Sequence, residues 1–327
     1  MNIMLIIKKI RKNRFSNKFF SVMCKCLSRF YRLPSKKTAV IVMDGGLCSQ
    51  MFEYTIGELL KANGFDVKFD LSWFENCGRD VLGKDARFFE IKKLYPKLLI
   101  KKASPLCIFR FKSEYRCNGD DFESIMAEKR NIYFLNDVPR KYPREKLAEI
   151  AKKVFCNPIA PRDKANVLVA EEIVNDPYSC AVHVRRGDLA NPDIAMKSGY
   201  GKCVSEDYYK NAVSIMKSLV PNARFYFFSD DLPFVKEKLL PLFGEIKYRI
   251  VDENISTVLN GGGYKDFYLI TLCRHQICSL GSFGIEAAKL NKNKNKIVIS
   301  PPRDTLVCLD NYIVLDESGN KIESKNL

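Results

Sequence analysis

Apolar runs rich in β-branched and aromatic residues alternate with amphipathic stretches along most of the chain. The runs predict buried strands, and the stretches with apolar residues three or four positions apart predict helices. Strands are expected at residues 38–43, 65–71, 131–136, 178–184, 224–228, 247–251, 275–279 and 297–300, the last strand of the chain. Helices are expected at residues 51–63, 144–154, 206–219, 232–240, 266–273 and 283–290. Strands that alternate with helices predict an α/β fold with a parallel sheet.

The length and one segment suggest how the chain divides into domains. A chain of 327 residues is long enough for two domains with separate cores. Residues 156–165 hold two prolines and several charges, which is typical of a linker. We therefore predict an N-terminal arm at residues 1–37, an α/β domain at 38–160 and a second α/β domain at 161–327.

Most of the positive charge lies in the N-terminal arm. The net charge is +16, and residues 1–37 contain eleven Lys and Arg and no acidic residue. The longest apolar run of the arm, residues 3–7, is too short to span a membrane, and it precedes the charges, unlike a signal peptide. These features favour a basic amphipathic helix on an anionic membrane surface. A disordered basic arm, or a helix docked on its own domain, is the alternative.

Two other partner classes are disfavoured. The rest of the chain has no concentrated basic stripe and no RNA- or DNA-binding motif, so no nucleic-acid partner is expected. The twelve cysteines are scattered, without a Cys-x-x-Cys pair that would indicate zinc or redox chemistry. We interpret them as reduced thiols of a cytoplasmic protein.

The strand ending at residue 184 runs into a charged loop of Arg185, Arg186, Gly187 and Asp188. In open α/β sheets ligands bind beyond the carboxyl ends of strands, and a guanidinium matches phosphate oxygens two at a time. We expect the two arginines to bind an anion. His183 is placed to exchange a hydrogen bond with the ligand. The alternative is an ordinary surface turn with a local ion pair.

Two further turns are candidates for ligand contacts. Asp44–Gln50 is a glycine-rich turn between a strand and a helix, where free N–H groups point at a ligand, although many such turns only connect elements. Ser229, Asp230 and Asp231 follow another strand. Paired aspartates hold divalent ions in many sugar transferases, but we favour a helix cap and expect no metal.

Several segments together resemble one enzyme family. His183–Asp188 resembles the signature of the α-1,2-fucosyltransferases, glycosyltransferase family 11. Gly45–Tyr54, Phe225–Asp231 and Asp266–Asn291 agree with further family motifs in content and order. The resemblance implies two Rossmann-like domains facing a cleft, the B-type glycosyltransferase architecture.

The resemblance also implies an activity. It is the inverting transfer of L-fucose from GDP-fucose to a β-galactoside hydroxyl, in an α-1,2 linkage, during bacterial surface-polysaccharide or O-antigen synthesis. No metal or other cofactor is implied. The acceptor would be a galactose-containing oligosaccharide or lipid-linked glycan, and the enzyme would lie at the inner face of the membrane. Another linkage, another GDP-sugar, or a non-catalytic nucleotide-sugar-binding scaffold are the alternatives.

The family motifs assign candidate residues to roles. Arg185 would stabilise the departing diphosphate. Asp266 would lie near the guanine, and Ser282 would meet a phosphate oxygen at a helix start. The full set of predicted donor contacts is His183, Arg185, Arg186, Asp188, Ser229, Asp230, Asp266, Ser282, Gly46 and Gln50.

The attacking hydroxyl needs a base. Asp193 lies five residues beyond Asp188, the spacing at which the related α-1,6 enzymes carry an acid. We predict Asp193 as the base, and the alternative is that it only shapes its loop. Two segments depart from the family pattern: Cys48 and Ser49 replace Gly and Asn, and Gly284–Glu286 replaces a serine and two tryptophans.

Overall fold

The computed structural model describes residues 22–75, 78, 86–117, 125, 127, 131–135, 143–197, 203–254, 261–302 and 312–322. The chain divides into two compact units. The first comprises Met1–Asp44, Phe52–Asn76 and Leu99–Ile150, and the second comprises Gly45–Met51, Cys77–Leu98 and Ala151–Leu327. The predicted domain boundaries and the predicted cleft remain predictions.

The first unit is built on a parallel sheet. Its described strands lie in the order β2-β1-β4-β3, and every pairing is parallel. They are β1 (Thr38–Val42), β2 (Asp66–Asp70), β3 (Arg116–Cys117) and β4 (Ile132–Phe134). The helices α3 (Leu47–Ala62), α4 (Ser72–Glu75), α6 (Pro105–Glu114) and α8 (Arg144–Val154) follow in the chain. Ser104 caps α6 by accepting from the N–H of Cys107.

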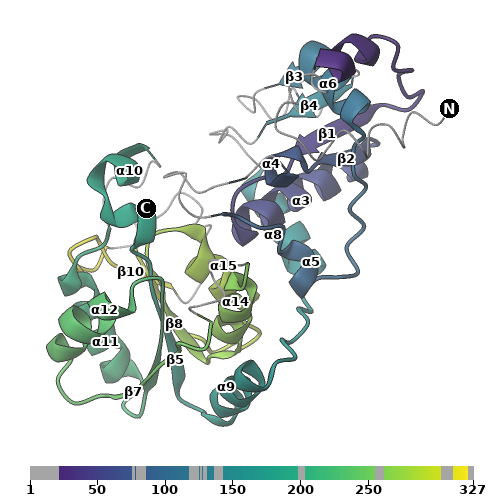
Figure 1. Ribbon diagram of the computed structural model, residues 1–327. Coiled ribbons are helices and arrows are strands. Elements are labelled where there is room, and N and C mark those ends of the chain that lie inside the picture. Colours follow the sequence, from purple (N-terminus) through teal and green to yellow (C-terminus); the bar gives the residue numbers. More distant parts are fainter. Residues whose placement is uncertain are drawn as a thin grey trace. The chain divides into compact units, whose positions relative to one another are not determined.

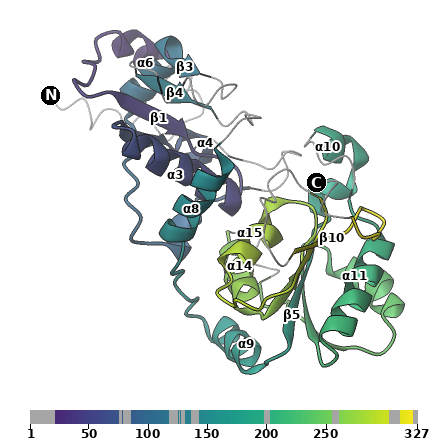
Figure 2. The ribbon, with the colours of Figure 1, turned by 180° about the vertical axis from the view of Figure 1, so that it is seen from behind.

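The second unit contains a larger parallel sheet. Its described strands lie in the order β10-β9-β8-β5-β6-β7. They are β5 (Ser179–Val184), β6 (Arg224–Ser229), β7 (Lys247–Ile250), β8 (His275–Ile277), β9 (Val298–Ser300) and β10 (Tyr312–Val314). Its helices are α5 (Ile91–Leu94), α9 (Lys164–Asn175), α10 (Pro192–Lys197), α11 (Glu206–Leu219), α12 (Leu232–Phe234), α14 (Gly263–Leu272) and α15 (Ser282–Leu290). Helices α11 and α12 cover one face of the sheet, and α14 and α15 cover the other (Figures 1 and 2).

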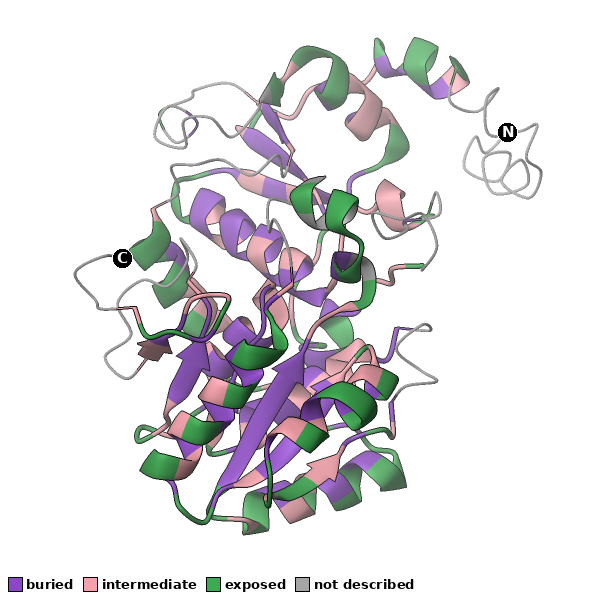
Figure 3. Cartoon of the chain, turned by 90° about the vertical axis from the view of Figure 1, so that its left-hand side faces the viewer, coloured by how far each residue is buried: buried purple, intermediate pink, exposed green. Residues whose placement is uncertain are grey.

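Strand β5 lies inside the sheet and is buried along its whole length. Its side chains alternate between the two faces, as strand geometry requires. Cys180, Val182 and Val184 join the core formed with α11, whereas His183 packs on Phe283 of α15. The helices of this unit bury one side and expose the other, which explains their amphipathic sequences (Figure 3).

The predicted α/β class with parallel sheets is confirmed, and α8 and α11 have the predicted bounds. Other bounds were wrong. Helix α3 begins at Leu47, not residue 51, because Gly45, with φ 65°, completes the turn earlier. The stretch 232–240 is not one α-helix: α12 passes into a π-turn at Val235–Leu239 and a 3₁₀ turn at Leu240–Leu242.

Among the elements of the second unit that were not predicted are a helix and a strand. Helix α9 begins inside the expected linker 156–165, at Lys164, with Asp163 as its cap. Strand β9 is not the last strand, because β10 pairs with it in parallel at the sheet edge. A three-residue edge strand carries too little periodic signal to be recognised in the sequence.

The described part of the N-terminal arm packs on the first unit. Residues 22–28 are helical, with Cys24 1% exposed, and Tyr31 and Leu33 contact the core around Phe111. This part of the arm therefore follows the docked alternative, while residues 1–21 lie outside the described residues. Within the part of the chain that the structure describes, no helix combines the length and apolarity needed to cross a bilayer.

Candidate active site

The carboxyl ends of β5 and β6 lie side by side and carry the predicted arginines and aspartates. Val184 and Ser229 are register partners, so the loops that follow them start together. Ser229 Oγ donates to the carbonyl of Val184 (2.9 Å) and accepts from the N–H of Asp231 (2.9 Å). Ser229 therefore fixes the two loops to each other.

Asp230 binds both residues of the arginine pair. One carboxylate oxygen pairs with Arg185 Nη1, and the other accepts from the backbone N–H of Arg186 at 2.8 Å. Gly187 allows this close approach, because a Cβ at that position would be 2.6 Å from Asp230 Oδ2. Asp230 thereby orients the Arg185 guanidinium at the strand end. The side chain of Asp188 lies outside the described residues.

Arg186 is held by a different set of contacts. Its Nε donates to Asp231 Oδ2 (3.3 Å), and its guanidinium carbon lies 3.8 Å from the centroid of the Phe234 ring, a cation–π contact. Asp231 Oδ1 accepts from the N–H of Phe234, which confirms the predicted helix cap. The described residues contain no cluster of His, Cys, Asp or Glu that could hold a metal ion.

His183 lies beneath this loop as a neutral imidazole. Burial lowers its pKa to about 4. Its ring stacks on Phe283 with centroids 5.4 Å apart, and Nδ1 has no hydrogen-bond partner among the described residues. Phe283 follows Ser282, the first residue of α15, so the structure brings Ser282 and His183 to the same end of the sheet.

Asp266 lies in the first turn of α14 and accepts from Asn254 Nδ2 at 2.6 Å. Asn254 also exchanges two hydrogen bonds with Asn166, each 2.9 Å long, and Asn166 Nδ2 donates to Asp163. Burial raises the pKa of Asp266 to about 7, against the lowering effect of the Asn254 hydrogen bond. Asn166 and Asn254 were missed in the sequence, where isolated asparagines give no signal for a buried pair.

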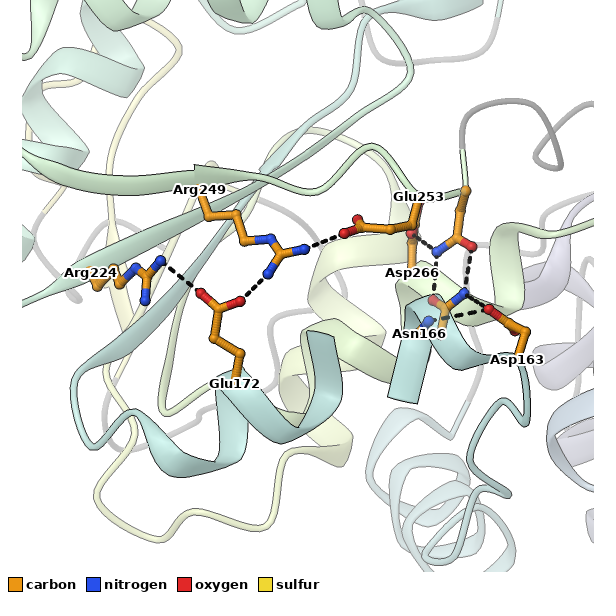
Figure 4. Close-up of polar contacts among 8 residues, drawn as sticks. Asp163, Asn166, Glu172, Arg224, Arg249, Glu253 and Asp266 are labelled. Carbon is orange, nitrogen blue, oxygen red and sulfur yellow. Dashed lines mark hydrogen bonds and ion pairs between the residues drawn. The ribbon is translucent and has the colours of Figure 1, made fainter. Parts of the chain in front are cut away.

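A chain of ion pairs continues from this cluster across the sheet (Figure 4). Glu172 of α9 pairs with Arg224 of β6 and with Arg249 of β7, and Arg249 also pairs with Glu253. Glu253 precedes Asn254, so α9, two strands and α14 are connected through polar side chains. This network fixes the position of Asp266.

Comparison with known proteins indicates which family the chain resembles. Residues 164–306 match the family model for glycosyl transferase family 11. An Alpha-1,2-colitosyltransferase of Escherichia coli is 27% identical over 284 residues, which cover 79% of this chain and 89% of that protein. The family match lies within the second unit and covers less than half of the chain, which is thus similar to glycosyl transferase family 11. This similarity supports a glycosyltransferase activity, and the relatives that the chain resembles are named for the transfer of fucose or colitose.

Two further comparisons cover different shares of this chain. Galactoside alpha-(1,2)-fucosyltransferase 2 of Mus musculus is 28% identical over 109 residues, 33% of this chain and 29% of the mouse protein. Among solved structures, NodZ alpha-1,6-fucosyltransferase co-crystallized with GDP has a TM-score of 0.46 and 16% identity, and the match covers 88% of this chain and 98% of that chain.

Gln50, a predicted donor contact, is completely buried. Its amide nitrogen donates to the carbonyls of Phe88 (2.8 Å) and Gly45 (3.3 Å). Its oxygen accepts from the N–H groups of Glu90 (2.9 Å) and Ile91 (3.1 Å). All four hydrogen-bonding positions of the side chain are taken, so the predicted direct contact with a ligand is corrected to a positioning role. Gly46 is only half-buried and stays a predicted contact.

Asp193 lies on the first turn of α10 and is exposed, and its N–H donates to Asn191 Oδ1 at 3.0 Å. A cavity of about 540 Å³ opens beside Arg186 in the second unit. Among the described residues, its lining contains the carboxylates Glu206 and Asp207 at the start of α11, and not Asp193. Asp193 therefore remains a predicted base, with no contact to the arginine loop established.

Proposed function

We propose that this family 11 enzyme transfers L-fucose from GDP-fucose to a hydroxyl of a β-galactoside in an α-1,2 linkage. The observation that carries the proposal is the arginine pair at the end of β5, oriented by Asp230 and by Phe234. Both named relatives, the colitosyltransferase and the mouse galactoside fucosyltransferase, carry α-1,2 in their names, which supports the linkage.

The arginine pair fits the charge that the reaction develops. When the bond between the sugar carbon and the diphosphate oxygen breaks, negative charge grows on the departing GDP and positive charge on the sugar. Preorganised guanidinium groups stabilise such a leaving group without reorganising during the step. Arg185 is held by Asp230 and Arg186 by Asp231 and Phe234, so both are fixed before substrate binds.

The acceptor hydroxyl attacks the anomeric carbon from the face opposite to GDP, which inverts the configuration. A base removes its proton, and we assign this role to Asp193, which is exposed at the start of α10. The arginines supply the positive charge that a diphosphate needs, so the proposed reaction runs without a metal ion.

The identity of the sugar in the donor is the specific point to test. The Escherichia coli relative is named for colitose, which lacks the 3-hydroxyl of fucose, so a colitose donor is the second candidate. Purified protein should be supplied with GDP-fucose, GDP-colitose or GDP-mannose and with β-galactosides, in buffer containing EDTA, and GDP release and product linkage measured. We expect GDP release with GDP-fucose and an α-1,2-linked product. Faster turnover of GDP-colitose than of GDP-fucose would identify GDP-colitose as the donor. Activity that requires added manganese would overturn the metal-free mechanism.

A chain that binds GDP-sugars and releases no GDP with any acceptor would instead be a nucleotide-sugar-binding scaffold. Binding of GDP by calorimetry, measured in parallel, separates this outcome from a protein that has lost its donor site. The acceptor that we propose in the cell is a galactose-containing oligosaccharide or lipid-linked glycan of O-antigen synthesis.

We also propose that residues 1–37 hold the enzyme on the inner, anionic face of the bacterial membrane, from the cytoplasm. The described part of the arm exposes Phe30 (85%), Val22 (61%) and Leu27 beside Lys25 and Arg29. Exposed apolar and basic side chains close together in the sequence suit an anionic interface.

The membrane proposal is tested with two changes that spare the packed part of the arm. Because Cys24, Tyr31 and Leu33 contact the first unit, deletion should end at residue 21, and Phe30→Glu should be made separately. Binding to vesicles with and without phosphatidylglycerol should fall in both variants, while transfer to a soluble acceptor persists. Unchanged binding to anionic vesicles in both would exclude the arm as the anchor.

A further inference from the structure

Helix α14 begins without a capping side chain of its own. Gly262 occupies the position before the helix, and the residues that lead into it are Gly261 and Gly262. The first N–H groups of a helix have no partner within the helix, and a buried N–H without a partner costs stability. The partner for this helix comes from a segment more than a hundred residues earlier in the chain.

Glu90 supplies the missing cap. Its Oε1 accepts from the backbone N–H of Tyr264 at 3.4 Å, and the N–H of Gly263 also faces the carboxylate. Glu90 is 9% exposed, and burial raises its pKa, against the lowering effect of these N–H groups and of Lys93. A carboxylate at this end of a helix interacts favourably with the helix dipole.

Two neighbours of Glu90 hold the glycines before the helix. Lys93 Nζ donates to the carbonyl of Gly261 at 2.6 Å. Gly261 has φ 76° and lies so close to Phe88 that a Cβ would be 2.9 Å from the Phe88 side chain. Three residues of the segment 88–93, namely Phe88, Glu90 and Lys93, therefore contact the start of α14.

Gln50 in turn holds the segment that carries Glu90. Its side chain, 0% exposed, binds the carbonyl of Phe88 and the N–H groups of Glu90 and Ile91. The glycine-rich turn that precedes α3 is thus connected through Gln50 and Glu90 to the first turn of α14. These contacts all lie within the second unit.

The first turn of α14 borders a cavity. Tyr264 lines a cavity of about 360 Å³ together with Lys93 and Arg162, and Asp266 lies two residues further along the helix. A shift of this turn would move the cavity wall and Asp266 together.

We propose that Glu90, held in place by Gln50, is a positioning residue that fixes the first turn of α14 for donor binding. The donor as the ligand rests on the proposed function, whereas the capping contact does not. Glu90 acts through Tyr264 and the helix, so its removal should affect donor affinity more than the chemical step.

The test compares Glu90→Ala, Glu90→Gln and the control Glu58→Ala, which removes a carboxylate of the first unit that pairs with Lys61 of α3. Hydrogen exchange without ligand should become faster in peptides covering residues 261–270 in Glu90→Ala. Affinity for GDP should fall about fivefold to tenfold, the size of losing a helix cap. Glu90→Gln, which retains an acceptor oxygen, should recover part of both losses, and Glu58→Ala should change neither.

Gln50→Ala and the double variant with Glu90→Ala complete the experiment. Because both residues act on the same turn, the double variant should exchange no faster at residues 261–270 than Glu90→Ala alone. Unchanged exchange there in Glu90→Ala and Glu90→Gln, or a fall in kcat at unchanged donor KM and GDP affinity, would overturn the proposal. Absence of GDP release from GDP-fucose in the unmodified protein would refute the proposed function and leave the exchange result intact.

Discussion

Gly284 of α15 lies against the imidazole of His183, and a Cβ at position 284 would be 2.9 Å from His183 Nδ1. The same Cβ would be 3.2 Å from Cβ and Cγ of the histidine. The ring cannot move away easily, because its other neighbour is Phe283. Glycine at this position therefore allows the neutral histidine to pack under the arginine loop.

Gly284→Ala should displace His183 and destabilise the protein. Alanine gains about 1 kcal/mol of helix propensity, but overpacking a buried ring costs about 1 to 3 kcal/mol, so we expect a net loss. The free energy of unfolding in urea measures it. Gly46→Ala is the stability control, because nothing lies within 4 Å of a Cβ at Gly46. Equal stability of the Gly284→Ala and native proteins would show that the ring relaxes without cost.

Arg185→Lys should lose most of the transfer activity. The planar guanidinium of Arg185 presents a fork of donors that can bind Asp230 and the diphosphate at the same time. The ammonium group of a lysine does not have this geometry. By analogy with removal of one oxyanion donor, we expect the transition state to lose roughly 3 kcal/mol of stabilisation, which lowers kcat. Arg144→Lys, on an exposed arginine at the start of α8, is the matched control for folding, assayed by thermal unfolding. Near-native turnover in Arg185→Lys would remove the argument for a bidentate contact.

Asp193→Asn separates donor binding from proton removal. If Asp193 is the base, GDP affinity should be retained while kcat falls about a hundredfold or more. Steady-state kinetics with calorimetry of GDP binding measure both quantities. Undiminished kcat would transfer the search to Glu206 and Asp207, the described carboxylates that line the cavity beside Arg186.

The raised pKa of Asp266 predicts a pH dependence of stability. Its pKa is about 7 in the folded protein and 3.8 as the ordinary value, so between these pH values the folded state keeps a proton that the unfolded state has released. The free energy of unfolding should therefore fall as pH rises from about 4 to about 7. The stabilisation is complete below this window and is lost as pH rises through it.

Asp266→Asn should remove this fall in the free energy of unfolding, which amounts to up to about 4 kcal/mol between about pH 4 and about pH 7. Urea unfolding at several pH values measures the slope. Asp252→Asn, an exposed carboxylate near the same polar cluster, is the control and should leave the slope unchanged. Parallel profiles for Asp266→Asn and the native protein would mean that Asp266 is ionised throughout this range.

The pattern of the sequence was sufficient wherever local information dominates. The bounds of α8 and α11 follow from their helical periodicity, and the charged loops after β5 and β6 follow from two apolar strands that end in charged residues. The family motifs also lie on contiguous segments. For these features, the residues that determine the structure are neighbours in the chain.

The tertiary structure alone decided which polar groups are still available to a ligand. Gln50 lies in a predicted binding turn, yet its partners are at residues 88–91, and Glu90 caps a helix 174 residues away. Asn254 reaches Asn166 across 88 residues and holds Asp266. A buried donor or acceptor takes whichever partner the fold brings within 3 Å or so, and that partner is set by packing between distant segments. The sequence therefore determined where the charged loops lie, and the packing of distant segments determined which polar side chains already have hydrogen-bond partners.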